Sequence, residues 1–138
     1  MKFVVDSSII VKWLSVSNEQ HIEKADKLLS DSLQGNVELF APELAKYEVG
    51  NVLLKGKQLA TKEAFISLGT AYALPITFVS ESEEIAKNTY SIAVSSSITY
   101  YDAAFISLAE QYGASLITEN IKHQGKTQNI KVISLTDY

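Results

Sequence analysis

The chain has 138 residues, of which 46% are hydrophobic and 20% are charged, so we expect residues 1–138 to form a single globular domain. The absence of cysteine excludes disulfides and thiolate metal sites, and the presence of only two histidines argues against an imidazole-rich zinc site. The formal net charge of −4 argues against a protein that binds nucleic acid through a broadly basic surface, and because all twelve basic residues are lysine, no guanidinium group is available for bidentate phosphate contacts.

The N-terminal part of the sequence predicts one strand and two helices. Residues 2–5 form a short apolar run that is typical of a buried strand, and the run ends at Asp6. Residues 8–14 have a helical pattern. A second helix is predicted from Asn18, as its capping residue, to Gly35, because apolar residues recur in it every three or four positions.

The rest of the sequence continues this alternation of strands and helices. A strand at 37–41 is followed by a helix that Pro42 opens and Gly56 closes, since proline is tolerated at the first helical position and glycine is frequent after the last. Thr61 caps the next helix. The remaining predicted elements are a strand at 76–79, a helix capped by Ser80 or Ser82, a helix at 101–112, a strand at 115–118, a polar loop at 119–130 and a strand at 131–135.

This order of elements indicates the fold class. Strands that alternate with helices favour a parallel sheet with helices on both faces, so we expect an α/β protein built as a three-layer α/β/α sandwich with a mainly parallel central sheet. The sequence contains no internal repeat or linker that would suggest a second domain. No apolar run is long enough to span a membrane and the N-terminus lacks the pattern of a signal peptide, so we expect a cytoplasmic location and no membrane partner.

Three acidic residues stand out from the predicted elements. Asp6 directly follows a buried strand, at the sheet edge where open α/β proteins bind their ligands. Glu48 interrupts an apolar helical face between Leu44 and Val52, and Asp102 lies in the first turn of a helix. Each also has an ordinary explanation: Asp6 as a helix cap, Glu48 as a boundary residue that leans into solvent, and Asp102 as a residue favoured by the helix dipole. The expected position of all three near one sheet edge favours a functional site.

A cluster of carboxylates requires either protons or a cation. Two carboxylates about 4 Å apart repel each other by about 4 kcal/mol at an effective dielectric constant of 20. A small set of oxygen ligands with room left for water and phosphate is typical of a site for Mg²⁺ or Mn²⁺. Such an ion activates water and neutralises charge on a phosphodiester, so the sequence predicts this chemistry at the cluster.

Four segments of the sequence resemble the motifs of a known family. They occur over nearly the whole chain, in the order and at the spacing of the PIN-domain ribonucleases, and within that family of the small toxins of the VapC type. Each segment is weak alone, and together they are fairly specific. The segments are Phe3-Val4-Val5-Asp6-Ser7-Ser8, Glu48-Val49-Gly50-Asn51, Tyr101-Asp102-Ala103-Ala104-Phe105 with Leu108-Ala109, and Leu116-Ile117-Thr118.

This resemblance implies a PIN-like fold and an endoribonuclease that hydrolyses RNA with Mg²⁺ or Mn²⁺. The residues that match the catalytic and metal-binding positions of the family are Asp6, Glu48 and Asp102, and those that match its supporting hydroxyl positions are Ser8 and Thr118. The family also implies a homodimer and a cognate antitoxin protein that blocks the site.

The sequence departs from the family pattern at Asn120. Members of the family often have a fourth acid at this position, two residues after the threonine. Glu119 precedes it, but neighbouring residues of an extended segment point to opposite sides, so Glu119 is not an automatic replacement. An amide can still hydrogen-bond a metal-bound water, so we expect Asn120 to be a supporting residue at a site with one ion rather than two.

Two other functions are compatible with the sequence. The first is a PIN-fold binding module with weak or no catalysis, because Asn120 weakens the site. The second is another α/β enzyme, but a phosphotransfer receiver would have an acid pair beside Asp6, and Ser8 stands where a DxD-type phosphatase has its second aspartate. Four basic residues could in principle contact RNA phosphates: Lys12, Lys122, His123 and Lys126. Such residues are usually solvated on the surface, so we expect them to be solvated and not to bind RNA.

Overall fold

The computed structural model describes residues 1–138 and contains five parallel strands in the order β3-β2-β1-β4-β5. The strands are β1 (Lys2–Val5), β2 (Glu38–Pro42), β3 (Ile76–Val79), β4 (Ser115–Thr118) and β5 (Val132–Ser134). The helices are α1 (Ser7–Lys12), α2 (Ile22–Leu33), α3 (Leu44–Asn51), which continues into the π-helical turn η1 (Val52–Gly56), α4 (Thr61–Ala73), α5 (Glu83–Ser96), α6 (Tyr100–Tyr112), α7 (Ile121–Gln124) and the short 3₁₀ turn η2 (Leu135–Asp137).

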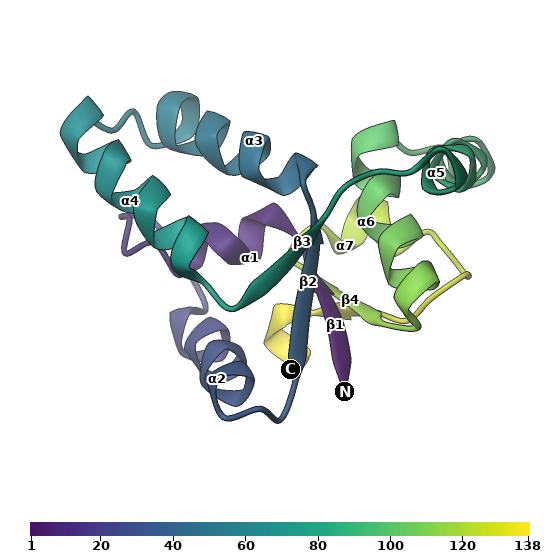
Figure 1. The fold of residues 1–138 in the computed structure, drawn as a ribbon, viewed down its shortest axis with the longest axis horizontal. Helices are drawn as coiled ribbons and strands as arrows, with labels where there is room; N and C mark the ends of the chain where they lie inside the picture. Colours follow the sequence, from purple (N-terminus) through teal and green to yellow (C-terminus); the bar gives the residue numbers. More distant parts are fainter.

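The sheet lies between two layers of helices. Figure 1 shows the strands in the middle, with α1 to α4 on one side and α5 and α6 on the other. All four strand pairings are parallel, which confirms the predicted α/β class and the three-layer sandwich. None of the helices has the length and apolar character needed to cross a membrane.

The central strands are buried on both faces. Val4 and Val5 of β1 and Leu116 and Ile117 of β4 have no exposed surface, and they belong to one hydrophobic core of 28 buried residues. Burial on both faces explains why these strands read as continuous apolar runs rather than alternating patterns. Val5 pairs with Ile117, so the residues that follow β1 and β4 emerge side by side at the carboxyl edge of the sheet.

Several predicted boundaries are confirmed by local geometry. The predicted strands at 2–5, 76–79 and 115–118 agree with β1, β3 and β4. Of the two serines considered as the cap of α5, Ser82 fills the role, because its hydroxyl accepts a hydrogen bond of 3.1 Å from the Ile85 amide.

Four other predictions about the elements are wrong. Thr61 does not cap α4, because it is the first residue of the helix and Ala60 occupies the capping position. Asn18 does not begin a helix: α2 starts at Ile22, because Asn18 and His21 both have left-handed backbone conformations, with φ of 61° and 58°. Pro42 does not open a helix either, since it is the last residue of β2 and pairs with Val79. The predicted polar loop at 119–130 contains the short helix α7.

Candidate active site

Asp6 lies at the carboxyl edge of the sheet, directly after β1. Its backbone amide donates a 3.1 Å hydrogen bond to the Ile117 carbonyl, which fixes it beside the end of β4. Its Oδ2 accepts hydrogen bonds from the Ser8 hydroxyl at 2.8 Å and the Thr118 hydroxyl at 3.3 Å. Although Asp6 occupies the capping position of α1, its side chain makes no capping hydrogen bond. Asp6, which is only 7% exposed, is therefore held by one hydroxyl from the first turn of α1 and one from the end of β4.

Glu48 reaches the same edge of the sheet from the middle of α3. Its Oε1 accepts a 3.0 Å hydrogen bond from the Ser7 hydroxyl, the residue next to Asp6. The residue is half-buried, since one side of α3 packs on the core through Ala45 and Val49. The sequence did not single out Ser7, although the neighbouring hydroxyls of the Asp-Ser-Ser segment were a signal that could have found it.

Asp102 lies in the first turn of α6, as predicted from the sequence. The hydroxyl of Thr99 caps this helix by accepting a 3.0 Å hydrogen bond from the Asp102 amide, so the aspartate side chain is not needed as the cap. One oxygen of the Asp102 carboxylate accepts a hydrogen bond of 3.4 Å from the Asn120 side-chain amide. The backbone amide of Asn120 in turn donates to the Thr118 hydroxyl at 2.8 Å.

These hydrogen bonds connect five of the six residues that the sequence assigned to the site. Asp6, Ser8, Thr118, Asn120 and Asp102 form one continuous chain of contacts. The sixth, Glu48, is joined to the segment after β1 only through Ser7.

The three carboxylates influence one another electrostatically. Burial raises the pKa of Asp6 above its usual value, against the lowering effect of the Ser8 and Ser7 hydrogen bonds, and the charge of Asp102 raises it further. Burial also raises the pKa of Glu48 to about 7, and the charges of Asp6 and Asp102 add to this increase. The negative charge at this edge of the sheet is therefore poorly compensated by the protein itself.

The chemistry of these side chains fits a hard divalent cation. The site provides carboxylate and hydroxyl oxygens and no softer ligand, which are the donors that Mg²⁺ and Mn²⁺ prefer. No three acidic or histidine side chains form a ready-made cage for a metal ion, so the carboxylates would have to draw closer around one. A cation would offset the burial of charge and the smaller mutual repulsion that together raise the pKa values of Asp6 and Glu48.

Glu119 points away from the three carboxylates. Its Oε2 lies 3.0 Å from the ammonium group of Lys12, which also contacts Glu19 at 3.1 Å and the Gln20 carbonyl at 2.6 Å. The prediction that Lys12 is solvated is wrong, because its side chain is only 1% exposed. Helix α1 runs from the sheet edge into the core, and Lys12 at its end is covered by the segment that follows. In contrast, Lys122, His123 and Lys126 are exposed.

The raised pKa of Glu48 predicts a pH dependence of stability in the metal-free protein. The folded protein holds this proton more tightly than the unfolded chain, because its pKa rises from 4.5 to about 7 on folding. The stability contributed by the protonated form is complete below pH 4.5 and is lost as the pH rises through 7. We expect Glu48→Gln to lose less stability than the parent between pH 5 and pH 8, measured by urea unfolding in the presence of a chelator. Glu63→Gln, at an exposed glutamate, serves as the control, and equal pH dependence of the parent and Glu48→Gln would contradict the expectation.

An open hollow lies beside Glu48. Residues from α1, α3, η1 and α6 line it: Ser7, Leu44, Tyr47, Glu48, Asn51, Val52 and Tyr101. Since Glu48 and Ser7 form part of its wall, a ligand in this hollow would contact the carboxylate edge of the sheet directly.

Comparison with known proteins identifies relatives with this fold. A model of the PIN domain family matches residues 3–127. The protein named Ribonuclease VapC3 from Pyrobaculum aerophilum is 34% identical over 122 residues, which cover 86% of this chain and 88% of that protein. Among solved structures, VapBC2 from Rickettsia felis, bound to a DNA fragment from its promoter, superposes with a TM-score of 0.76 at 16% identity over 97% of this chain and 98% of that chain. A toxin-antitoxin complex from Klebsiella pneumoniae superposes with a TM-score of 0.67 at 17% identity over 98% of both chains.

At such low sequence identity the two solved structures demonstrate only that the fold is shared. The match to the PIN domain model and the similarity to Ribonuclease VapC3 are evidence for the family itself. Both agree with the resemblance to PIN domains and VapC proteins that the sequence motifs indicated. With the PIN domain model matched from β1 to beyond α7, and a VapC protein similar over most of its length, this chain belongs to the PIN domain family.

Proposed function

We propose that this protein is a divalent-metal-dependent endoribonuclease and the toxin of a toxin-antitoxin pair. The observation that carries the proposal is the set of coupled carboxylates at the carboxyl edge of the sheet, two of which have raised pKa values. Its similarity to Ribonuclease VapC3 supports RNA as the substrate. The proposal treats residues 1–138 as one catalytic domain around the single hydrophobic core.

In this proposal Asp6, Glu48 and Asp102 hold Mg²⁺ or Mn²⁺ and are the catalytic residues. When bound, the ion neutralises charge on the scissile phosphodiester and lowers the pKa of the attacking water. The hydroxyls of Ser8 and Thr118 hold the Asp6 carboxylate in one orientation through the hydrogen bonds described above.

Asn120 supports the site by a different route. Its side-chain amide donates to Asp102 and so fixes one of the three carboxylates without adding negative charge. A site with three acids and an amide has less charge to hold cations than a site with four acids, and Glu119 is already paired with Lys12. We therefore propose one tightly bound ion.

The proposed partners follow from the relatives. The structural neighbours include toxin-antitoxin complexes, which supports an antitoxin protein as the partner of this chain and, with it, a cytoplasmic location. A homodimer is also proposed. Large hydrophobic side chains that a second copy would cover are exposed on α3, η1 and α4: Tyr47, Leu54, Phe65, Ile66 and Tyr72.

The second candidate function is an RNA- or protein-binding module of the PIN fold without catalysis. Two observations favour it: Asn120 stands in place of an acid, and the carboxylates do not form a ready-made cage for a metal ion. The two functions differ in their response to metal.

Metal removal separates these two functions. We expect the purified protein to cleave RNA in Mg²⁺ or Mn²⁺, to lose this activity in excess chelator, and to regain it when the ion is restored. Calorimetric titration of the metal-free protein should give one ion per chain. If the protein binds RNA but neither cleaves it nor binds either ion, it is a binding module and the ribonuclease proposal is wrong.

A further inference from the structure

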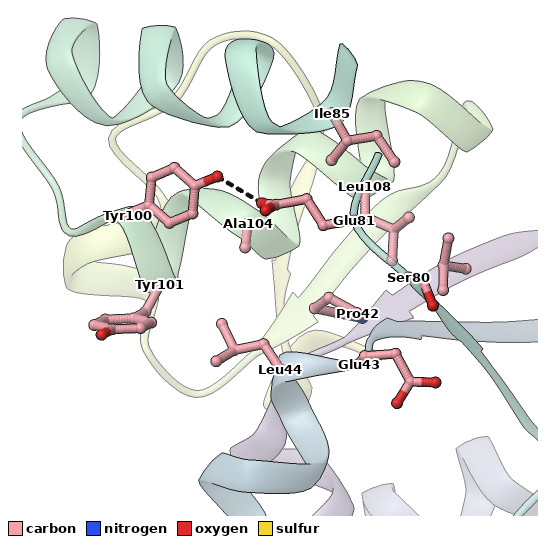
Figure 2. Close-up of a pocket in the computed structure, with 11 residues that line it drawn as sticks. Pro42, Glu43, Leu44, Ser80, Glu81, Ile85, Tyr100, Tyr101, Ala104 and Leu108 are labelled. Atoms are coloured by element: carbon pink, nitrogen blue, oxygen red, sulfur yellow. Dashed lines mark hydrogen bonds between the residues drawn. The ribbon is translucent and has the colours of Figure 1, made fainter. Parts of the chain in front are cut away.

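A second pocket lies next to the carboxylate site, at the carboxyl ends of β2 and β3. It has a volume of about 180 Å³ and is enclosed by α3, α5 and α6 (Figure 2). A closed cavity of about 150 Å³ holds one benzene molecule, so this larger pocket, which is also open on one side, has room for a flat ring system bigger than benzene. Most of its wall is apolar, and the wall includes Pro42, Leu44, Ile85, Ala104 and Leu108.

The pocket adjoins the hollow beside Glu48. Leu44 and Tyr101 line both cavities, and Figure 2 shows these two side chains next to each other at one side of the pocket. A polymer whose backbone lies at the three carboxylates therefore needs to extend only past Tyr101 to place a side group in the pocket.

One polar pair, Tyr100 and Glu81, lines the pocket on its solvent-exposed side. The Tyr100 hydroxyl donates a 2.6 Å hydrogen bond to Oε1 of Glu81, and this hydrogen bond raises the pKa of Tyr100 to about 12. Oε2 of Glu81 accepts no hydrogen bond from the protein. The other carboxylate of the lining, Glu43, is already paired with Lys46 at 2.9 Å.

These groups restrict the chemistry of the ligand. The lining contains two carboxylates and no lysine or histidine, so a phosphate group would be repelled. A purely apolar group would cover Glu81 without giving its free oxygen a donor, which is unfavourable. A neutral, flat ring with N–H donors on its edge satisfies both the apolar wall and the carboxylate.

We propose that this pocket binds a nucleobase of the RNA substrate, in a nucleotide adjacent to the scissile phosphate, and that it prefers guanine. The inference rests on the proposed ribonuclease function. Guanine presents two neighbouring donors, N1–H and the 2-amino group, on one edge, whereas adenine, cytosine and uracil each present fewer donors there. Tyr100 and Tyr101 supply aromatic surface of the kind that stacks on unpaired RNA bases.

A binding experiment tests the pocket without any need for cleavage. The metal-free full chain is titrated with 5′-GMP, 5′-IMP and 5′-AMP, and amide and methyl NMR shifts are recorded for Ile85, Tyr100 and Tyr101. We expect GMP to perturb these signals and to bind more tightly than IMP, which lacks the 2-amino group. Glu81→Gln should weaken GMP binding about tenfold. Glu84→Gln, an exposed glutamate outside the pocket, should bind GMP as the parent does.

A cleavage experiment then connects the pocket to the reaction. RNA in which inosine replaces the guanine next to a cut site should be cut about tenfold more slowly by the parent, and the difference between the two RNAs should be smaller for Glu81→Gln. If RNA is cut but neither GMP binding nor the choice of cut site depends on Glu81, the proposal is overturned. It is also overturned if Glu81→Gln weakens only the binding of a protein partner. If GMP binds as expected and no RNA is cleaved, the nucleobase pocket stands and the ribonuclease function is the part that fails.

Discussion

Replacement of Asp6 by asparagine is expected to reduce RNA cleavage at least about 100-fold, the scale of losing one preorganised catalytic group. Asp6 is the most buried of the three carboxylates and is held by the hydroxyls of Ser8 and Thr118. Asparagine keeps an oxygen that can accept these two hydrogen bonds, so the fold should be retained while the charge that attracts the cation is lost. Cleavage of a labelled RNA in Mg²⁺ measures the effect.

The same variant should be at least as stable as the parent when no metal is bound. Burial raises the pKa of Asp6, so ionisation of this group opposes folding near neutral pH. Mg²⁺ or Mn²⁺ should raise the melting temperature of the parent and have little effect on Asp6→Asn. The control is Asp26→Asn, at an exposed aspartate of α2, which should retain both activity and the metal response. Cleavage by Asp6→Asn at the parent rate would remove Asp6 from the proposed metal site.

The sequence predicted the sheet well because strand and helix patterns are local. The strand Ile76–Val79 is preceded by a proline, and Ser115–Thr118 follows the glycine that ends α6, so turn-forming residues mark both starts. The start of α2 was missed because it depends on left-handed backbone at Asn18 and His21. Asparagine and histidine are enriched in that conformation, but most residues of both types do not adopt it, so their presence alone did not predict it.

The place of the candidate site was predictable for a similar reason. Asp6 follows a buried strand, and residues after parallel strands meet at one sheet edge, so its neighbourhood with Thr118 and Asn120 follows from the fold. The direction of each side chain does not follow from position along the chain. Glu119 and Asn120 are neighbours in sequence, yet Asn120 turns to Asp102 and Glu119 turns to Lys12.

The ion pair between Lys12 and Glu119 joins distant parts of the chain. A lysine at the end of a short helix is usually exposed, and no local pattern indicated that this one is buried. Its ammonium group lies between Glu119 and Glu19, and Glu19 also contacts Lys57 at 2.6 Å. These ion pairs form a row of four residues with alternating charge. The row joins Glu119 after β4, Lys12 at the end of α1, Glu19 before α2 and Lys57 after η1.

Lys12→Met is therefore expected to destabilise the protein by about 3 kcal/mol, the scale on which a buried ion pair loses one partner. The methionine fills most of the volume of the lysine stem but leaves Glu119 without a cation and the Gln20 carbonyl without a donor. Urea unfolding at neutral pH measures the change. The matched control is Lys87→Met, whose ion pair with Glu83 has side chains 76% and 84% exposed, and it should change stability by no more than about 0.5 kcal/mol.

A double variant identifies the cause of this loss. In Lys12→Met combined with Glu119→Gln, the carboxylate that has lost its partner is replaced by a neutral amide, so the loss should be smaller than in Lys12→Met alone. The Glu119→Gln change by itself should cost stability, because Lys12 then keeps only Glu19 as its acid partner. If Lys12→Met is as mild as Lys87→Met, or if the two changes simply add, the ion pair does not hold Glu119 in place. A coupling between them would show instead that Lys12 keeps this acid away from the three carboxylates and leaves Asn120 alone beside Asp102.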